Sequence, residues 1–256
     1  MIWTNLILIF AAFFLAGGEE IPPVLTAKEH PWGHFEPGSH CTIQTVITTN
    51  VGSQTSKFYR ATKAELISVD KNGVHLQETE TAETGNKLPG KERQTMRDTD
   101  FYQETVQKET QVRQGPLSKL MIGRKVVPCL TRIYETKTAD GDLSVTIWYS
   151  PQVCPYVLRT ERVLRSAAAD KPVVYQCVAA VQETSALKSK FGRNDKTYSI
   201  QITEKTAGNI TKITEERGSW DIPGGILYSV TREFNEKNEE IRVTVSRTAT
   251  YRGRWK

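Results

Sequence analysis

The sequence predicts an all-β protein, an antiparallel meander of about eleven strands that forms a strongly curved sheet or a partly open barrel. From residue 41 onward, apolar and polar residues alternate in short segments, turn signals separate these segments, and helix signals are nearly absent. In LSVTIWYS, residues 143–150, Leu143, Val145, Ile147 and Tyr149 share one face because strand side chains alternate with a period of two. So many twisted strands favour a curled sheet over a flat one.

The predicted strands follow one another with short breaks. They are CTIQTVITT (41–49), KAELISV (63–69), GVHLQETET (73–81), VVPCLTRIYET (126–136), LSVTIWYS (143–150), YVLRTERVL (156–164), VVYQCVAAVQE (173–183), YSIQITEK (198–205), NITKITEE (209–216), GILYSVTREF (225–234) and IRVTVSRTATY (241–251). Asn72-Gly73 and Asp140-Gly141 supply the positive φ that tight hairpin turns need, so we expect neighbouring strands to be antiparallel.

Two stretches lack this alternation. Residues 19–38 are rich in proline, glycine and histidine, and we expect them to form an extended arm. Residues 92–110 are largely polar and fit either an exposed helix or a long loop. Residues 39–256 are expected to form a single β-rich domain.

Two segments, residues 129–163 and 198–234, resemble each other. Each runs from a strand through a turn to a second strand that ends near a tryptophan, followed by a proline-containing turn and a third strand. Trp148 and Pro155 mark the first segment, and Trp220 and Pro223 mark the second. The pattern suggests duplication of one sheet-forming unit, with chance similarity between threonine-rich strands as the alternative.

The first 18 residues fit a cleavable signal peptide. Residues 6–16 (LILIFAAFFLA) are apolar and precede Gly17 and Gly18, the layout of a secretory signal, although no lysine or arginine comes before them. The run is shorter than the roughly 20 residues of a membrane-spanning helix. Because no second apolar stretch follows, we expect an exported protein, periplasmic or secreted, that is soluble after cleavage and has no transmembrane segment.

Four cysteines follow the predicted signal peptide: Cys41, Cys129, Cys154 and Cys177. In an oxidising compartment an even number indicates disulfides first, and four cysteines allow three pairings that the sequence does not distinguish. Cys129 and Cys177 also lie in apolar, strand-like segments, where a buried free thiol is the alternative.

Composition and motifs argue against several functions. The chain has 34 basic and 29 acidic residues spread along its length, a net charge of +5, which does not indicate nucleic-acid binding. The sequence contains no GxSxG, Walker, GxGxxG or HExxH motif. We therefore expect no catalytic residues and no cofactor.

Three of the four histidines cluster in the arm and next to it. His30, His34 and His40 are followed by Cys41, and imidazole and thiolate groups are ligands that zinc and copper accept. Their spacing matches no established ligand motif, so the alternative is that they pack as ordinary amphipathic side chains.

Several motifs carry resemblances. HPWGHFEPGSH (30–40) resembles the start of uncharacterised exported bacterial proteins. The pairing of a strand-end tryptophan with a proline turn in TIWYSPQVCPYVLRTERV (146–163) and SWDIPGGILYSV (219–230) is distantly similar to periplasmic lipoprotein carriers and related lipid-binding half-barrels. The second resemblance implies a curved sheet whose concave face holds acyl chains, although the helices that plug such sheets are not visible in this sequence.

These observations leave three hypotheses. The first is an exported, non-catalytic binding protein that holds an apolar or lipid-like ligand on a concave sheet, with Trp148, Tyr149, Trp220 and Tyr228 as candidate ligand-binding residues. The second is an envelope-structural or protein-interaction domain in which these aromatic residues fill the core. The third is a hydrolase of an envelope or extracellular polymer. The sequence identifies no protein partner.

Overall fold

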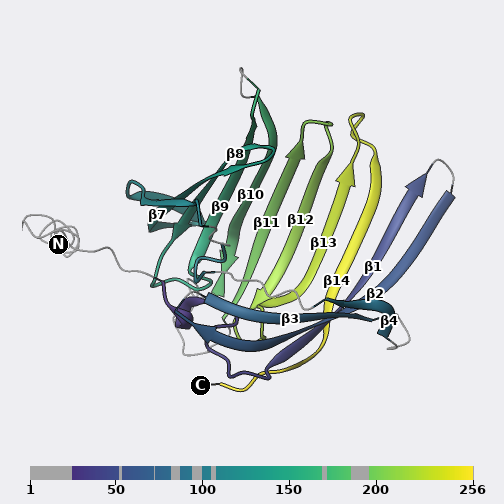
Figure 1. Cartoon of the computed structure of the whole chain (residues 1–256), viewed down its shortest axis with the longest axis horizontal. Coiled ribbons are helices and arrows are strands. Elements are labelled where there is room, and N and C mark those ends of the chain that lie inside the picture. Colours follow the sequence, from purple (N-terminus) through teal and green to yellow (C-terminus); the bar gives the residue numbers. More distant parts are fainter. Residues whose placement is uncertain are drawn as a thin grey trace, which may run out of the picture.

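One open antiparallel sheet accounts for almost the whole fold (Figure 1). The computed structural model describes residues 25–51, 54–71, 73–81, 87–93, 100–104, 108–168, 172–185 and 196–255, and the predicted signal peptide lies outside them. Among the described residues, helical structure is limited to short 3-10 turns, of which η1 (Ala27–Glu29) is the named one, so the predicted all-β class is confirmed. Within these ranges, no helix has the length and apolar character needed to cross a membrane.

The described residues form fourteen strands. They are β1 (His40–Val51), β2 (Gln54–Asp70), β3 (Gly73–Thr81), β4 (Lys87–Arg93), β5 (Gln111–Gln114), β6 (Ser118–Ile122), β7 (Lys125–Thr138), β8 (Gly141–Tyr149), β9 (Val157–Ser166), β10 (Val173–Thr184), β11 (Thr197–Thr206), β12 (Thr211–Ser219), β13 (Ile226–Phe234) and β14 (Glu240–Arg252). Every predicted strand is present. The additional strands, β4, β5 and β6, are short, and β4 (KLPGKER) contains a proline and a glycine, which strand patterns disfavour.

The order of strands leaves the sheet open and sets its two edges. The path runs β4-β3-β2-β1-β14-β13-β12-β11-β10-β9-β8-β7-β5, with β6 paired to β7 beside it. The first and last strands, β1 and β14, pair with each other, so the edges are β4 and β5, which follow one another in the chain. The connection between them therefore runs from one edge of the sheet to the other. Its described residues, 100–104 and 108–110, form turns rather than a helix.

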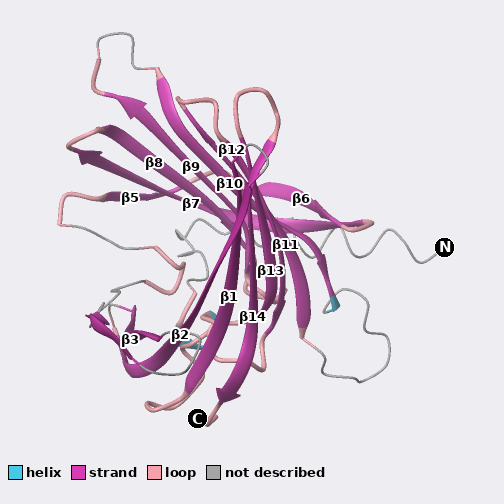
Figure 2. Ribbon diagram, turned by 90° about the vertical axis from the view of Figure 1, so that its right-hand side faces the viewer, coloured by secondary structure: helices cyan, strands magenta, loops and turns pink. Residues whose placement is uncertain are grey.

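Two apolar clusters on the same face show that the sheet is curved. The β7–β8 cluster contains Leu25, Tyr102, Tyr134, Val145, Ile147 and Tyr149; the β1–β3 cluster contains Trp32, Phe35, Cys41, Leu66 and Val74. Seven strands separate β7 from β1 along the sheet, yet Phe101 packs against both clusters. The two ends of the sheet therefore converge on this face, which we call the concave face. Figure 2 shows β3 and β5 bent toward the same side of the central strands.

The turns after β8 and β12, which belong to the two similar segments, are built alike. The amide of Ser150 donates to the carbonyl of Tyr156 at 2.8 Å, and the amide of Ser219 donates to the carbonyl of Gly225 at 2.7 Å. Tyr156 and Gly225 both have positive φ, 68° and 79°. Because Ser150 corresponds to Ser219, Trp148 and Trp220 occupy different positions in these two turns.

Replacing Phe101 should weaken the fold because this ring joins the two apolar clusters. We expect Phe101→Ala to lower the free energy of unfolding by about 2 kcal/mol, less than for a fully buried phenylalanine because Phe101 is only half-buried. Phe58→Ala is the control: Phe58 is 52% exposed, so its loss should cost less than about 0.5 kcal/mol. Urea unfolding measures both, and equal losses would contradict the bridging role of Phe101.

Candidate functional site

A row of uncharged side chains crosses the concave face over nine consecutive strands, from β2 to β8. The strand registers place in this central row Phe58, Ile47, Thr244, Thr231, Thr214, Ile202, Ala179, Thr160 and Ile147. Ile147 belongs to the β7–β8 cluster, and Ile47 shares a face of β1 with Cys41 of the β1–β3 cluster, which fixes the row on the concave face. Between the two ends, from Ile47 to Ala179, the side chains remain partly accessible.

Hydroxyl groups near the middle of the concave face bond to one another. The Oγ1 atoms of Thr214 and Thr231 lie 2.8 Å apart, and Oγ1 of Thr45 lies 3.0 Å from Oγ of Ser246. Each pair joins neighbouring strands and satisfies one hydrogen bond per side chain without water. The threonines therefore add little desolvation cost where an apolar molecule covers them.

A charged row lies on the same face, one step toward the β13–β14 turn. The register aligns Arg242, Glu233, Lys212, Glu204 and Arg162. Glu233 lies 3.5 Å from Arg242 and 4.0 Å from Lys212. Arg162 pairs with Glu104 of the β4–β5 connection. Most charges in this row therefore have an opposite charge beside them.

The side chains of residues 25–38 close the opposite end of the concave face. Phe35 forms a β-bridge with Trp255, and their rings lie 4.8 Å apart. His34 stacks between Trp220 and Trp255, with ring centroids 4.9 and 4.8 Å away. We call this packed aromatic end the base. The central row thus runs between a charged row on one side and the base on the other.

A polar network fastens residues 100–104 to the sheet. The hydroxyl of Tyr134 donates to Oδ2 of Asp100 at 2.5 Å and accepts from Nε of Arg132 at 2.9 Å. The Arg132 guanidinium also lies 4.4 Å from the ring centre of Tyr102. Burial and the neighbouring Asp100 carboxylate raise the pKa of Tyr134 well above its usual value, so its hydroxyl remains a donor. For Glu104, the upward effect of burial on the pKa exceeds the downward effect of Arg162.

The aromatic residues proposed as ligand contacts do not form one site. Tyr149 lies on the concave face, fully buried and edge-on to Tyr102 at 4.9 Å. Trp148 lies on the convex face, under the guanidinium of Arg159 at 5.0 Å. Tyr228 also points to the convex face and is 42% exposed. Trp220 is buried in the base.

The three clustered histidines bond to backbone atoms rather than to one another's side chains. His30 is buried, and its Nδ1 accepts from the amide of Trp32 at 3.1 Å. The ring nitrogens of His34 lie 3.1 Å from the carbonyl oxygens of His30 and Trp220. Nδ1 of His40 lies 3.3 Å from the carbonyl oxygen of Gly38. Among the described residues, no group of three or more His, Cys, Asp or Glu side chains could hold a metal ion.

The four cysteines are free thiols, contrary to the expected disulfides, and all are buried. They are kept apart because Cys41 packs in the β1–β3 cluster, Cys129 packs with β6, Cys154 lies in the turn after β8, and Cys177 lies on β10. Burial raises the pKa of Cys41 and Cys129 to about 11 and that of Cys154 to about 12. These three thiols are therefore protonated near neutral pH, which makes them poor nucleophiles and poor metal ligands.

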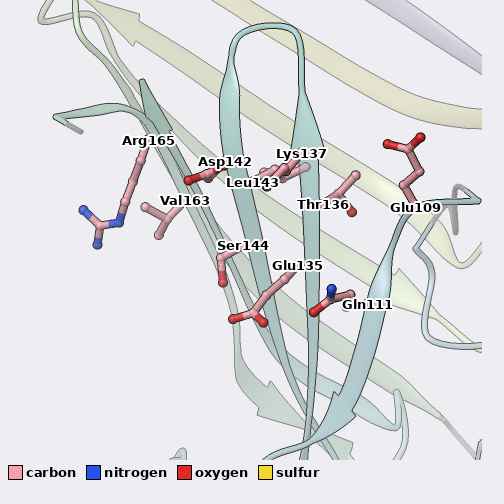
Figure 3. A pocket seen from close by; sticks show the side chains of 10 residues that line it. All are labelled: Glu109, Gln111, Glu135, Thr136, Lys137, Asp142, Leu143, Ser144, Val163 and Arg165. Atoms are coloured by element: carbon pink, nitrogen blue, oxygen red, sulfur yellow. The ribbon is translucent and has the colours of Figure 1, made fainter. Parts of the chain in front are cut away.

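A separate hollow of about 340 Å³ lies between β5, β7, β8 and β9 (Figure 3). Its lining includes side chains of both charges, among them Glu109, Glu135, Lys137, Asp142 and Arg165. Glu135 and Lys137 alternate with Tyr134, which faces the concave side, so the hollow opens on the convex face. It is therefore distinct from the central row.

No motif in the sequence marks the central row. Its members are ordinary strand residues, mostly threonine, isoleucine and alanine, from nine separate segments. The only local signal is the period-two pattern, which assigns faces within a strand but not the register between strands. The row therefore becomes visible only when all the pairings are known.

Comparisons with known proteins give weak structural likenesses. No family model matches the chain, and no curated protein is significantly similar to it in sequence. A domain provisionally described as an outer membrane lipoprotein-sorting protein, from Vibrio parahaemolyticus, is similar with a TM-score of 0.38 and 10% identity, covering 85% of each chain. An exported protein with a YmcC-like fold from Bacteroides fragilis, also a provisional description, gives a TM-score of 0.31 and 10% identity over 86% of this chain and 99% of its own. At these TM-scores, neither neighbour assigns a ligand to this chain.

Removing the Tyr134 hydroxyl should loosen the β4–β5 connection. Tyr134→Phe leaves Asp100 and Arg132 without their shared partner, and we expect it to lower the free energy of unfolding by about 1–3 kcal/mol. Tyr59→Phe, at a site that is 40% exposed, should change it by less than about 0.5 kcal/mol. Guanidinium unfolding compares the two variants, and a silent Tyr134→Phe would show that the network does not stabilise the fold.

Burial of neutral His30 should make the protein acid-sensitive. Burial, and next the charge of His34, lower the pKa of His30 from 6.5 to about 3. The folded state therefore binds this proton less readily than the unfolded state, and stability should fall as the pH drops from about 6.5 toward 3, by up to about 1.4 kcal/mol per pH unit. In His30→Asn, the amide oxygen can still accept from the Trp32 amide but does not titrate.

The measurement is the free energy of unfolding of both proteins between pH 8 and pH 4.5. Above pH 7 the difference between them should be constant. Below pH 6.5 it should shift steadily in favour of His30→Asn. Parallel curves over the whole range would rule out His30 as the source of the acid sensitivity.

Proposed function

We propose that this protein is a non-catalytic, extracytoplasmic binding protein that holds an extended apolar or lipid-like ligand against the central row of its concave face. The observation that carries the proposal is the continuous uncharged row itself, which crosses nine strands and stays partly accessible in its middle. The Thr214–Thr231 hydroxyl pair at its centre supports it, because the bond between these groups replaces one hydrogen bond to water for each of them.

The length of the row suits an acyl chain. The accessible part of the row, from Phe58 to Ala179, crosses seven strands, which gives six intervals of about 4.8 Å, or roughly 29 Å along the sheet. Two acyl chains placed end to end span the hydrocarbon core of a bilayer, about 30 Å, so one extended chain is roughly 15 Å long. Burying about ten methylene groups stabilises a complex by roughly 8 kcal/mol before the cost of ordering the ligand. The row is therefore long enough to hold a single acyl chain.

The alternative is an envelope-structural or interaction domain with a filled core. The two clusters and the base are packed in this way, since Tyr149, Phe35 and Trp220 are buried. The middle of the concave face differs, because Thr231, Thr214 and Ile202 remain partly accessible. The ligand hypothesis is therefore the one that accounts for the central row.

Native mass spectrometry of protein purified from its own compartment tests the two hypotheses directly. The binding hypothesis predicts a co-purifying lipid that organic extraction removes. Extraction should then open a site that binds 11-(dansylamino)undecanoic acid with an increase in dansyl fluorescence. A clean apo mass together with no binding of the dansyl probe would leave the filled-core alternative.

A matched pair of charge insertions localises the site. Ala179 and Ala180 are neighbours on β10, but Ala179 lies in the central row and Ala180 faces the convex side beside Arg159. Ala179→Glu would place a carboxylate against the acyl chain, and we expect it to weaken binding of the dansyl probe at least about tenfold. Ala180→Glu should leave the affinity unchanged. Equal affinities in the two variants would exclude the central row as the binding surface.

A further inference from the structure

Glu216 is an isolated carboxyl group on the concave face. It lies on β12, where it pairs with Ile200 on β11 and Ser229 on β13. Ser229 pairs with Ser246 on β14, and Ser246 pairs with buried Thr45 on β1, which faces the same side as the β1–β3 cluster. Glu216 therefore occupies the row next to the central row, on the side of the base.

Nothing in the described part of the chain compensates its charge. No hydrogen bond or ion pair joins a described residue to its carboxylate, and burial alone raises its pKa to about 7. The titratable groups on the same face of β11, β12 and β13 are Tyr198, Glu204, Lys212 and Glu233. Lys212 is the one cation of this set and already pairs with Glu233, while the hydroxyl of Tyr198 donates to the carbonyl of Gly225.

Such a group is costly in a protein that has no use for it. An unpaired carboxylate in a half-buried setting loses hydration, whereas a glutamine or a threonine at the same position would not carry this cost. The neighbouring positions across the sheet, Ser229 and Ile200, show that uncharged side chains fit this row. The unpaired charge is therefore best explained by a partner that comes with the ligand.

We propose that Glu216 binds the ammonium group of a cationic amphiphile whose chain lies along the central row. The inference rests on the proposed function and narrows its ligand class to lipids or other amphiphiles with an amino group. An ammonium group offers hydrogen-bond donors to the carboxylate and supplies the missing positive charge. The hydroxyl of Ser229, one strand away, is a second acceptor on the same face. Thr214, two residues along β12, then leads from the headgroup site into the central row.

This arrangement couples binding to pH. An ammonium group binds the ionised carboxylate of Glu216 more tightly than the protonated carboxyl group. The affinity for an amine ligand should therefore increase as the pH rises through about 7, the pKa of Glu216. An uncharged headgroup gains nothing from ionisation. Of the facing groups, Glu204 and Glu233 carry the same charge as Glu216, and Lys212 carries the opposite charge. These charges are the same whichever ligand is bound, so they do not account for a difference between a charged and an uncharged headgroup.

The experiment compares dodecylamine with 1-dodecanol, which share a chain and differ in charge. Isothermal titration below the micelle concentration, on delipidated full-length mature protein, gives the dissociation constants at pH 8 and pH 5.5. At pH 8 we expect dodecylamine to bind at least about tenfold more tightly than the alcohol. At pH 5.5 the preference should shrink to about twofold or less, because Glu216 is then protonated.

Two variants assign the preference to one side chain. Glu216→Gln keeps the shape, removes the charge, and should abolish the preference for dodecylamine while still binding 1-dodecanol. Glu215→Gln is the matched control, because Glu215 is the next residue and faces the convex side, exposed. It should retain the full preference.

The outcomes separate this inference from the proposed function. Equal binding of the two ligands by the unmodified protein, or a preference that survives Glu216→Gln, would overturn the role of Glu216 and leave the acyl-binding proposal standing. If neither ligand binds at either pH, both proposals fail. Loss of the preference in Glu216→Gln alone supports both.

Discussion

Phe101 joins the two ends of the concave face. Its ring packs against the β7–β8 cluster and against the β1–β3 cluster, which are far apart in strand order. The chain reaches this point because it passes directly from one edge strand, β4, to the other, β5. The Asp100–Tyr134–Arg132 network fixes the same connection to the sheet by hydrogen bonds. The contacts of this one connection therefore hold the two ends of the curved sheet near each other, although the sheet does not close into a barrel.

Once the sheet is curved, strand register divides its concave face into three levels. The charged row neutralises itself through contacts such as Arg242–Glu233. The central row combines β-branched residues, which suit strands, with the hydrogen-bonded hydroxyl pair of Thr214 and Thr231. The base is filled by aromatic side chains around His34. Glu216 interrupts this order, since it is a charge without a partner between the uncharged row and the base.

The histidine, cysteine and tryptophan residues that the sequence offers as candidate ligands or ligand contacts mainly pack the base and the clusters. His30 is buried and neutral, and burial and the charge of His34 lower its pKa. Cys41 and Cys154 are protonated because burial raises their pKa values. Trp220, taken from sequence as a ligand contact, stacks on His34 instead. The surface available for a ligand consists mostly of threonine, isoleucine and alanine, which form no recognisable functional motif in the sequence.

The sequence alone determined the strands, because a period of two and turn residues such as Asp140-Gly141 are local properties of the chain. Only the tertiary structure decided that Ala179, Thr214 and Ile47 lie in one row, and that Glu216, one of many glutamates in the sequence, stands there without a counter-charge. The reason is physical: rows across a sheet depend on the register between distant segments, which no local pattern encodes.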